Sequence, residues 1–262
     1  MTKTEKSLKQ RLKNGDIVFG VWNSIPSSTL VDVIGSSGID FIVIDAEHGP
    51  VGMETAEDLV RAAQVSGMSS LIRVSTNEAP LILRALDIGA HGVQVPHITT
   101  KEEAKQVVRF AKYYPQGVRG FSPFTRAASY GIQTKGYTKK ANDETLVVVN
   151  IEGKEGTKNI EDIAGIAGID VIFIGPYDLS QSLGKPGEVR DSEIIDTIKR
   201  TVAIADKHGI ACGSFAPDES YLELLIECGV RYLTYMVDTA FIAKAYKKVF
   251  DSFCKNKERR ES

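Results

Sequence analysis

The stretch FIVIDAEHGP, residues 41–50, begins with four apolar residues and then brings three ionisable side chains within four positions. The apolar run at residues 41–44 predicts a buried strand, because it is short, continuous and rich in β-branched residues. Asp45, Glu47 and His48 follow it directly. Burying carboxylates and an imidazole is unfavourable unless they are paired or bind a ligand. The stretch therefore predicts a core strand whose carboxyl end reaches a polar site.

Similar apolar runs recur along the chain and alternate with segments of helical periodicity. Their hydrophobicity is continuous, which is typical of strands covered on both faces in a parallel sheet. Several helical segments end in a glycine just before the next strand, as helix C-termini often do. The predicted strands are residues 18–22, 41–45, 70–74, 92–96, 146–152, 171–175, 211–215 and 232–237. Helices are predicted at residues 27–37, 54–66, 79–88, 100–113, 192–208, 217–228 and 239–253, and the fourth opens with a capping box of Thr100 and Glu103.

Eight strands with intervening helices favour a single (β/α)8 barrel over residues 1–253, followed by a charged tail at residues 254–262. A doubly wound open sheet is the main rival, but no G-x-G-x-x-G motif follows any predicted strand. The segment between the fourth helix and the fifth strand contains GVRGFSPFTRAASYG, residues 117–131. A loop of this length in a compact domain is usually functional or mobile.

The composition is that of an ordinary globular protein. The 262 residues are 42% hydrophobic and 25% charged, and the net charge is −2. This charge does not indicate a nucleic-acid or anionic-membrane partner. The three cysteines are widely spaced, which fits reduced thiols in a cytoplasmic protein. We find neither a secretory h-region nor an apolar run of about 18–20 residues, so we expect a cytoplasmic protein that acts on small molecules.

In a (β/α)8 barrel the active site lies at the carboxyl ends of the strands, so the polar residues there are the candidates. Glu152 and Asp178 end two neighbouring predicted strands. Two carboxylates suit a hard divalent cation such as Mg²⁺ and leave coordination positions for water and a bidentate 2-oxo acid. The alternative is that these residues only cap the helices that follow, since Asp is a good N-cap.

His48 is a candidate general base, which Asp45 or another nearby carboxylate would orient. The alternative is a loop histidine whose partners are backbone groups. Arg73 lies on an apolar strand, and a buried guanidinium needs an anionic partner. It would hold a substrate carboxylate or stabilise an enolate. An ion pair with Glu47 or Asp45 is the structural alternative.

The remaining candidates carry weaker signals. Trp22 either lines a pocket or fills the top of the barrel, and His97 fits a core histidine better than a catalytic one. His91 and His208 lie in turns at the opposite end and are expected to be structural. No predicted strand contains a lysine, and Lys154 is the nearest one, so a Schiff-base mechanism lacks an obvious nucleophile.

A resemblance to a known family adds to these inferences. The chain resembles the HpcH/HpaI family of metal-dependent pyruvate aldolases over about residues 5–253, through GVWNS, FIVIDAEHGP, LIRVSTNEAP, ALDIGAHGVQVP, GVRGF, VNIEGKEG, VIFIGPYDLS and MVDT. The resemblance implies a (β/α)8 barrel with a short N-terminal helix and a divalent ion, Mg²⁺, Mn²⁺ or Co²⁺. It implies reversible aldol cleavage of a 4-hydroxy-2-oxo acid, either a 2-keto-3-deoxy sugar acid or a diacid. The products would be an aldehyde and pyruvate, the latter formed through a metal-stabilised enolate.

The same resemblance assigns roles to individual residues. Glu152 and Asp178 match the metal ligands, His48 the catalytic base and Arg73 the enolate stabiliser. Asp87 matches an aspartate that, in relatives, raises the basicity of the histidine of a neighbouring subunit. Family members are typically hexamers, trimers of dimers in which C-terminal helices swap between protomers, so we expect a homo-oligomer.

The chain departs from the family pattern around the substrate. Asn150 stands where some relatives carry a glutamine that contacts the substrate, and Tyr177 stands where a small residue is frequent. Tyr235 and Met236 replace a smaller pair. Because of these departures, the sequence does not identify the aldehyde half of the substrate. The candidate substrate contacts are Asn150, Tyr177, Asp178, Trp22 and Glu47.

Two other functions fit the same residues. The first is a metal-dependent lyase or decarboxylase of an oxaloacetate-like 2-oxo acid, which would use the same site for a different step. The second is a barrel that binds 2-oxo acids without catalysis. A complete set of base, arginine and two carboxylates argues against the second.

Overall fold

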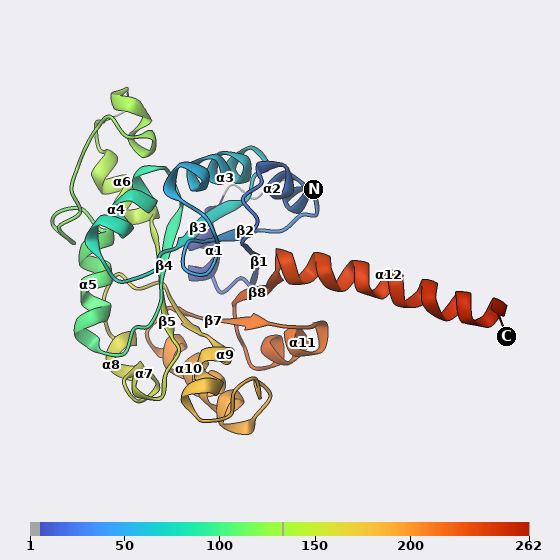
Figure 1. Cartoon of the computed structure of the whole chain (residues 1–262). Helices are drawn as coiled ribbons and strands as arrows, with labels where there is room; N and C mark the ends of the chain where they lie inside the picture. Colours follow the sequence, from blue (N-terminus) through green and yellow to red (C-terminus); the bar gives the residue numbers. More distant parts are fainter. Residues whose placement is uncertain (1–5, 133, 262) are drawn as a thin grey trace.

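The computed structural model describes residues 6–132 and 134–261. Its eight strands form a closed barrel in which each strand is parallel to its neighbours and the order follows the chain (Figure 1). The strands are β1 Val18–Asn23, β2 Phe41–Asp45, β3 Ser69–Arg73, β4 Gly92–Val95, β5 Leu146–Ile151, β6 Val171–Ile174, β7 Ala211–Ala216 and β8 Tyr232–Val237. The predicted (β/α)8 barrel is therefore confirmed, and the open sheet is excluded.

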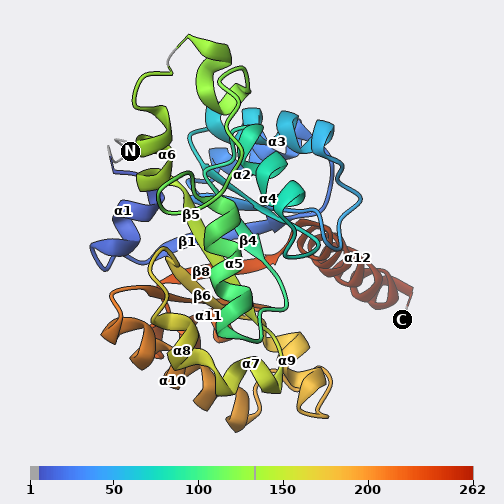
Figure 2. The same ribbon diagram turned by 90° about the vertical axis from the view of Figure 1, so that its left-hand side faces the viewer.

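Helices surround the barrel (Figures 1 and 2). The predicted helices are present as α2 Ser28–Ser36, α3 Met53–Val65, α4 Ala79–Asp87, α5 Lys101–Ala111, α10 Ser192–Lys207, α11 Glu219–Glu227 and α12 Asp238–Glu261. The expected short N-terminal helix is α1, Leu8–Lys13. The capping box at the start of α5 is also confirmed, because the Thr100 hydroxyl accepts from the amide of Glu103 and the Glu103 carboxylate accepts from the amide of Thr100.

The sequence pattern missed several short helices. These are α6 Tyr137–Glu144, α7 Lys154–Lys158, α8 Ile160–Ala164, α9 Pro176–Ser182 and the 3₁₀ segment η1 Arg126–Gly131. Most are too short to show helical periodicity in sequence. The helix predicted at residues 239–253 is longer in the structure, since α12 continues through the charged segment as far as Glu261. No glycine or proline interrupts residues 239–261, so nothing in the sequence ends the helix earlier.

Aromatic rings fill the interior of the barrel. Phe41 stacks on Tyr232 with ring centroids 4.4 Å apart, and Phe173 meets Tyr232 edge-on at 6.1 Å. Gly20 faces the Phe41 ring so closely that a methyl group there would overlap it. A second, larger apolar cluster lies outside the sheet and packs the strands against the helices. These rings fill the centre of the barrel, so it is a packed core and not a channel.

The register between β2 and β3 places two charged residues side by side at the carboxyl end of the barrel. Asp45, the last residue of β2, lies directly beside Arg73, the last residue of β3. Neighbouring parallel strands carry paired residues on the same face of the sheet. The backbone alone therefore brings a carboxylate and a guanidinium together where two strands end.

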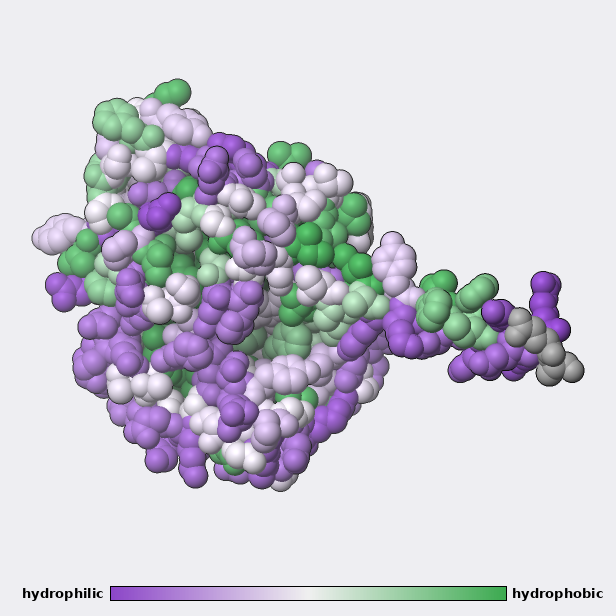
Figure 3. Space-filling view, in the orientation of Figure 1, coloured by the Kyte–Doolittle hydropathy of each residue, from purple (hydrophilic) through white to green (hydrophobic). Residues whose placement is uncertain are grey.

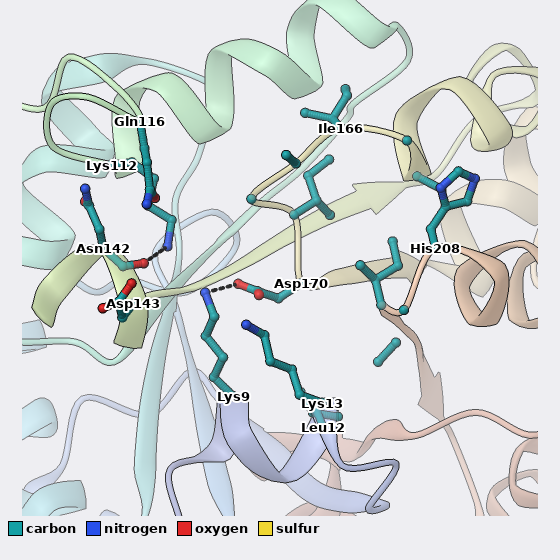
Figure 4. A pocket seen from close by; sticks show the side chains of 18 residues that line it. Lys9, Leu12, Lys13, Lys112, Gln116, Asn142, Asp143, Ile166, Asp170 and His208 are labelled. Carbon is teal, nitrogen blue, oxygen red and sulfur yellow. Dashed lines mark hydrogen bonds and ion pairs between the residues drawn. The ribbon is translucent and has the colours of Figure 1, made fainter. Parts of the chain in front are cut away.

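Two buried lysines stand at the amino end of the barrel (Figure 4). Lys9 of α1 forms an ion pair with Asp170 at 3.0 Å and donates to the carbonyl of Thr145 at 2.9 Å. Lys112 donates to the carbonyls of Asn142 and Thr145, each at 2.8 Å. Burial and the neighbouring charge of Lys9 together lower the pKa of Lys112 to about 7, against the opposing effect of Asp170.

No helix in the described part of the chain is long and apolar enough to cross a membrane.

The pKa of Lys112 predicts a specific pH dependence of stability. Lys112 has a pKa of about 7 in the folded protein and an ordinary pKa of 10.5 in the unfolded chain. Between pH 7 and pH 10.5 the unfolded chain therefore binds more protons at this residue than the folded protein does. The contribution of Lys112 to the free energy of unfolding therefore increases as the pH rises from about 7 towards 10.5. Lys112→Met removes the ionisation, so across this window the wild type should gain a few kcal/mol relative to the variant, at about 1.4 kcal/mol per pKa unit.

Urea unfolding at several pH values, in chloride buffers, measures this difference. The charges facing the Lys112 ammonium, namely Lys9, Lys13 and Asp170, are retained in both proteins. Lys105→Met, on the exposed face of the same helix, is the control and should track the wild type at every pH. Parallel stability curves for wild type and Lys112→Met would contradict the prediction.

Candidate active site

The carboxyl ends of β2 and β3 carry a forked ion pair. The Nε and Nη2 atoms of Arg73 donate to the two oxygens of Asp45 at 2.9 and 2.7 Å. Both side chains are buried. A two-point contact of this kind holds the planar guanidinium in one orientation. The structural alternative raised by the sequence, an ion pair of Arg73 with Asp45, is thus present.

Arg73 has two further partners. Its Nη1 atom lies 2.9 Å from Glu47 Oε2, and its Cζ atom lies 4.3 Å above the Trp22 ring. Trp22 is buried at the top of the barrel, and its indole N–H donates to Thr234. The hydrogen bonds to Asp45 engage two of the five guanidinium N–H groups, and Nη1 lies beside Glu47, so N–H groups remain that can donate to a substrate.

Asp45 also organises the loop that follows β2. Its Oδ1 atom accepts from the backbone amides of Glu47 at 3.1 Å and His48 at 3.3 Å. The His48 side chain itself is exposed. Within residues 6–132 and 134–261, no hydrogen bond or ion pair joins the His48 imidazole to Asp45, so Asp45 positions His48 through its backbone and not through its ring.

His97 bridges two acidic residues at the rim. Its Nε2 atom lies 3.0 Å from Glu47 Oε1, and its Nδ1 atom lies 3.1 Å from Glu152 Oε2. An imidazolium donates through both ring nitrogens, which suits this arrangement. The backbone amide of His97 also donates to Glu152 at 3.0 Å, and the residue adopts a left-handed conformation with φ of 58°. The left-handed backbone directs both the amide and the ring of one residue towards the same carboxylate.

A chain of buried hydrogen bonds supports Glu152 from within the barrel. The Tyr232 hydroxyl donates to Gln94 at 3.2 Å, and the Gln94 amide donates to Asn150 at 2.9 Å. The Asn150 amide in turn donates to Glu152 Oε1 at 2.9 Å. Asn150 is fully buried, so it lies beneath the carboxylate and holds it in place.

The surroundings of Glu152 fit a cation. Burial raises its pKa, and the negative charge of Asp178 raises it further, against the opposing effect of His97 and Asn150. Asp178 is exposed in the first turn of α9. A methyl group on Gly175 would lie 2.8 Å from the Glu152 side chain, so only glycine leaves room for this carboxylate. A divalent ion would relieve the repulsion between the two carboxylates.

The donor set allows at most a two-carboxylate metal site. In residues 6–132 and 134–261, no group of three or more His, Cys, Asp or Glu side chains is arranged to hold a metal. Glu152 and Asp178 therefore fit an ion such as Mg²⁺, which commonly takes one or two carboxylates and fills its other positions with water or substrate oxygens. Glu47 Oε2 is buried without a directed hydrogen bond and could accept one from such a ligand.

Asp87 lies away from this site within the chain. It ends α4, near the amino end of the barrel, and accepts from Arg119 at 2.6 Å. Arg119 is itself buried and lies over the Tyr113 ring. Tyr177 is half-exposed beside Asp178 and packs edge-on against Phe215. A single chain thus brings together Asp45, Glu47, Arg73 and Glu152 but leaves Asp87 apart.

The sequence underestimated His97 and omitted Gln94 from the site. His97 follows Pro96 at the end of β4, so its position at the rim was itself a signal. Gln94 is a buried amide in an otherwise apolar strand, which indicates a polar partner inside the barrel. His91 and His208 lie at the amino end, as predicted; His91 accepts from the amide of Ser70, and His208 lies near Glu161.

Comparison with known sequences identifies the family. Residues 19–245 match the model of the HpcH/HpaI aldolase/citrate lyase family. A hydroxypyruvate/pyruvate aldolase of Roseobacter denitrificans is 33% identical over 93% of this chain and 95% of its own. A 5-keto-4-deoxy-D-glucarate aldolase of Citrobacter koseri is 34% identical over 91% of this chain and 93% of its own.

Solved structures agree with this assignment. An HpcH/HpaI aldolase/citrate lyase family protein from Burkholderia cenocepacia has a TM-score of 0.89 and 31% identity, covering 94% of this chain and 98% of its own. A citrate synthase, SbnG, has a TM-score of 0.85 and 33% identity, covering 98% of this chain and 99% of its own. The chain therefore belongs to the HpcH/HpaI aldolase/citrate lyase family and is a carbon–carbon lyase.

Proposed function

We propose that the protein is a divalent-metal-dependent aldolase that reversibly cleaves a 4-hydroxy-2-oxo acid to pyruvate and an aldehyde. The observation that carries this proposal is the Glu152 carboxylate, whose pKa is raised by burial and further by Asp178, at the same rim as Arg73. Relatives named as aldolases of hydroxypyruvate and of a keto-deoxy sugar acid support the reaction class.

Glu152 and Asp178 would hold the metal ion. A bound divalent ion supplies a Lewis acid that polarises the keto group of a 2-oxo acid. Asn150 and the amide of His97 fix the Glu152 carboxylate, so it meets the ion without rearranging. Preorganised charges of this kind need little reorganisation during the reaction.

Arg73 would bind the pyruvate half of the substrate. Asp45 and Glu47 orient its guanidinium, and the two hydrogen bonds to Asp45 leave other N–H groups unused. These groups suit a carboxylate or an oxygen on which negative charge develops during cleavage. Trp22 lies against the guanidinium and so positions it, although direct contact of Trp22 with substrate stays a prediction.

His48 would move the proton of the substrate hydroxyl at C4. Its imidazole is exposed at the rim, and the Asp45 carboxylate fixes its backbone. General acid–base assistance of this type is typically worth about 10²–10⁴-fold in rate. Tyr177 and Asp178 would lie on the aldehyde side, where the bulk of Tyr177 narrows the space for the acceptor.

The same site supports a second candidate reaction. Decarboxylation of an oxaloacetate-like acid also forms a pyruvate enolate, so the residues above would serve it equally. A citrate synthase among the similar structures adds a further carbon–carbon reaction to compare. Product analysis separates these reactions, using pyruvate with an aldehyde panel, oxaloacetate alone, and oxaloacetate with acetyl-CoA.

Proton exchange of pyruvate tests the proposal directly. In D₂O with Mg²⁺ or Mn²⁺, the protein should exchange the methyl protons of pyruvate, because enolisation is half of the aldol reaction. Protein stripped with a chelator should lose exchange and regain it when the metal returns. Proton NMR follows the methyl signal. A barrel that only binds 2-oxo acids would leave the signal unchanged, and full exchange without metal would refute metal dependence.

Substitution at His48 should separate cleavage from metal binding. His48→Ala should lower kcat for aldol cleavage by about 10²–10⁴-fold while Mn²⁺ binding, measured by equilibrium dialysis, is retained. Glu152→Gln should lose both. Lys154→Ala is the matched control, since Lys154 is exposed just beyond β5 and the proposed mechanism uses no amine. A large loss in Lys154→Ala would instead indicate a Schiff-base mechanism.

We also propose that the protein is a homo-oligomer, as the family resemblance implies. Figures 1 and 3 show α12 projecting away from the barrel. Tyr246, Val249, Phe250 and Phe253 are all exposed on this helix and lie at the spacing of one helical stripe. A second copy that receives this stripe would bury it, and contacts between copies would let Asp87 of one subunit approach His48 of another.

The stripe on α12 should control assembly. Phe250→Ser with Phe253→Ser should reduce the molar mass measured by light scattering, because two large apolar side chains leave the interface. Lys248→Ser with Lys255→Ser is the control and should keep the mass of the wild type. If both double variants have the same molar mass, α12 does not form part of the interface between copies.

A further inference from the structure

The residues that face inward at the carboxyl end of the barrel divide into a charged half and an apolar half. Alternate residues of a strand face opposite sides of the sheet, so the side chains of the interior cluster show which positions point inward. On the side of β2, β3 and β5, the inward positions at the rim carry the charged residues of the candidate site. On β1, β7 and β8 the corresponding positions carry apolar side chains, which are Trp22, Phe215 and Val237.

These three side chains and Tyr177 form a continuous surface, the apolar wall. Phe215 and Val237 are partly buried and pack against the interior cluster that contains Trp22. Tyr177 meets Phe215 edge-on, with ring centroids 5.9 Å apart, and is 47% exposed. The wall therefore extends from the top of the barrel core to the surface, and its outer residues keep apolar area that a ligand can cover.

The apolar wall adjoins the groups that would hold the 2-oxo acid. At one end, the guanidinium of Arg73 lies 4.3 Å from the centre of the Trp22 ring. At the other end, Tyr177 is next to Asp178 in the first turn of α9. A substrate whose 2-oxo acid end lies between Arg73 and the two carboxylates would thus place its remaining part along the wall.

A second carboxylate on the substrate would need a cation beside this wall. Arg190, which contacts the start of α11, already pairs with Asp218 at 2.8 Å. Lys244 of α12 donates to the carbonyl of Pro217 at 3.2 Å. Asp238 follows β8 and adds a negative charge, which the structure holds through several N–H donors. These charges on the side of β7 and β8 disfavour a carboxylate at the far end of the substrate.

We propose that the apolar wall binds the aldehyde half of the substrate and that this aldehyde carries an uncharged, apolar group in place of a carboxylate. The inference rests on the proposed function, because it takes the pyruvate half as bound beside Arg73. Cleavage breaks the C3–C4 bond, turns the C4 hydroxyl into the aldehyde carbonyl and adds a proton to C3. An apolar group on C4 leaves water when it covers the wall, whereas a carboxylate there would lose hydration without gaining a partner.

Two aldehydes of matched shape test the inference in the direction of synthesis. In 4-methylpentanal, an isopropyl group takes the place of the carboxylate of succinic semialdehyde. With saturating pyruvate and Mg²⁺, kcat/KM for 4-methylpentanal should exceed that for succinic semialdehyde by at least about tenfold. Liquid chromatography of the 4-hydroxy-2-oxo acid product measures both rates. Equal values, or a preference for succinic semialdehyde, would overturn the inference.

Exchange of the pyruvate methyl protons in D₂O, measured on the same sample, separates this inference from the proposed function. Exchange without a preference for the apolar aldehyde overturns the inference and leaves the proposed function in place. The absence of both exchange and aldol product overturns both.

Three variants locate the effect at the wall. Tyr177→Lys places an ammonium group beside the acceptor, so the ratio of the two kcat/KM values should shift severalfold towards succinic semialdehyde. Tyr177→Phe keeps the ring and should keep the ratio of the wild type. Val65→Lys adds the same charge at the exposed end of α3 and is the control, which should also keep the ratio. Equal ratios in Tyr177→Lys and Val65→Lys would show that the acceptor does not lie at the wall and would overturn the proposal.

Discussion

The ion pair between Arg73 and Asp45 is the interaction on which the carboxyl end of the barrel depends. It follows from the register of β2 against β3, which places the two residues side by side. Once Asp45 fixes the guanidinium, Glu47 can pair with its remaining side, and His97 can bridge Glu47 to Glu152. The ends of four consecutive strands are thereby joined by ionic contacts. Removing any one member leaves a buried charge without its partner, which is strongly unfavourable.

A second constraint reaches the same carboxylate from inside the barrel. The hydrogen bonds from Tyr232 through Gln94 and Asn150 end on Glu152 Oε1, while His97 occupies Oε2. The donors of Tyr232, Gln94 and Asn150 are all buried, so each of these hydrogen bonds replaces one that the group would make to water. The carboxylate is held rigidly although burial and Asp178 disfavour its charge. A site that fixes an anion in an unfavourable environment is well suited to a cation.

The sequence predicted the barrel more completely than it predicted the site. Continuous apolar runs located all eight strands, with ends that differ from the structure by a residue or so, because packing on both faces demands such runs. The rim position of Asp45, Arg73 and Glu152 followed from the fold. Their pairing did not, since an arginine beside two carboxylates allows several arrangements. The left-handed turn at His97 has no signal in its local sequence. The role that the family resemblance implies for Asp87 would involve a neighbouring subunit, so it stays a prediction.

The two ends of the barrel accommodate buried charge in different ways. At the carboxyl end, Asp45, Glu47 and Glu152 outnumber Arg73, and His97 can add only one positive charge. At the amino end, Lys9 pairs with Asp170, while burial and the charge of Lys9 lower the pKa of Lys112 to about 7. The aromatic plug of Phe41, Phe173 and Tyr232 separates them, so neither end can neutralise the other. The carboxyl end must therefore find its counter-charge in solution, which favours a cation there, whereas the amino end reduces its own charge because Lys112 loses its proton near neutral pH.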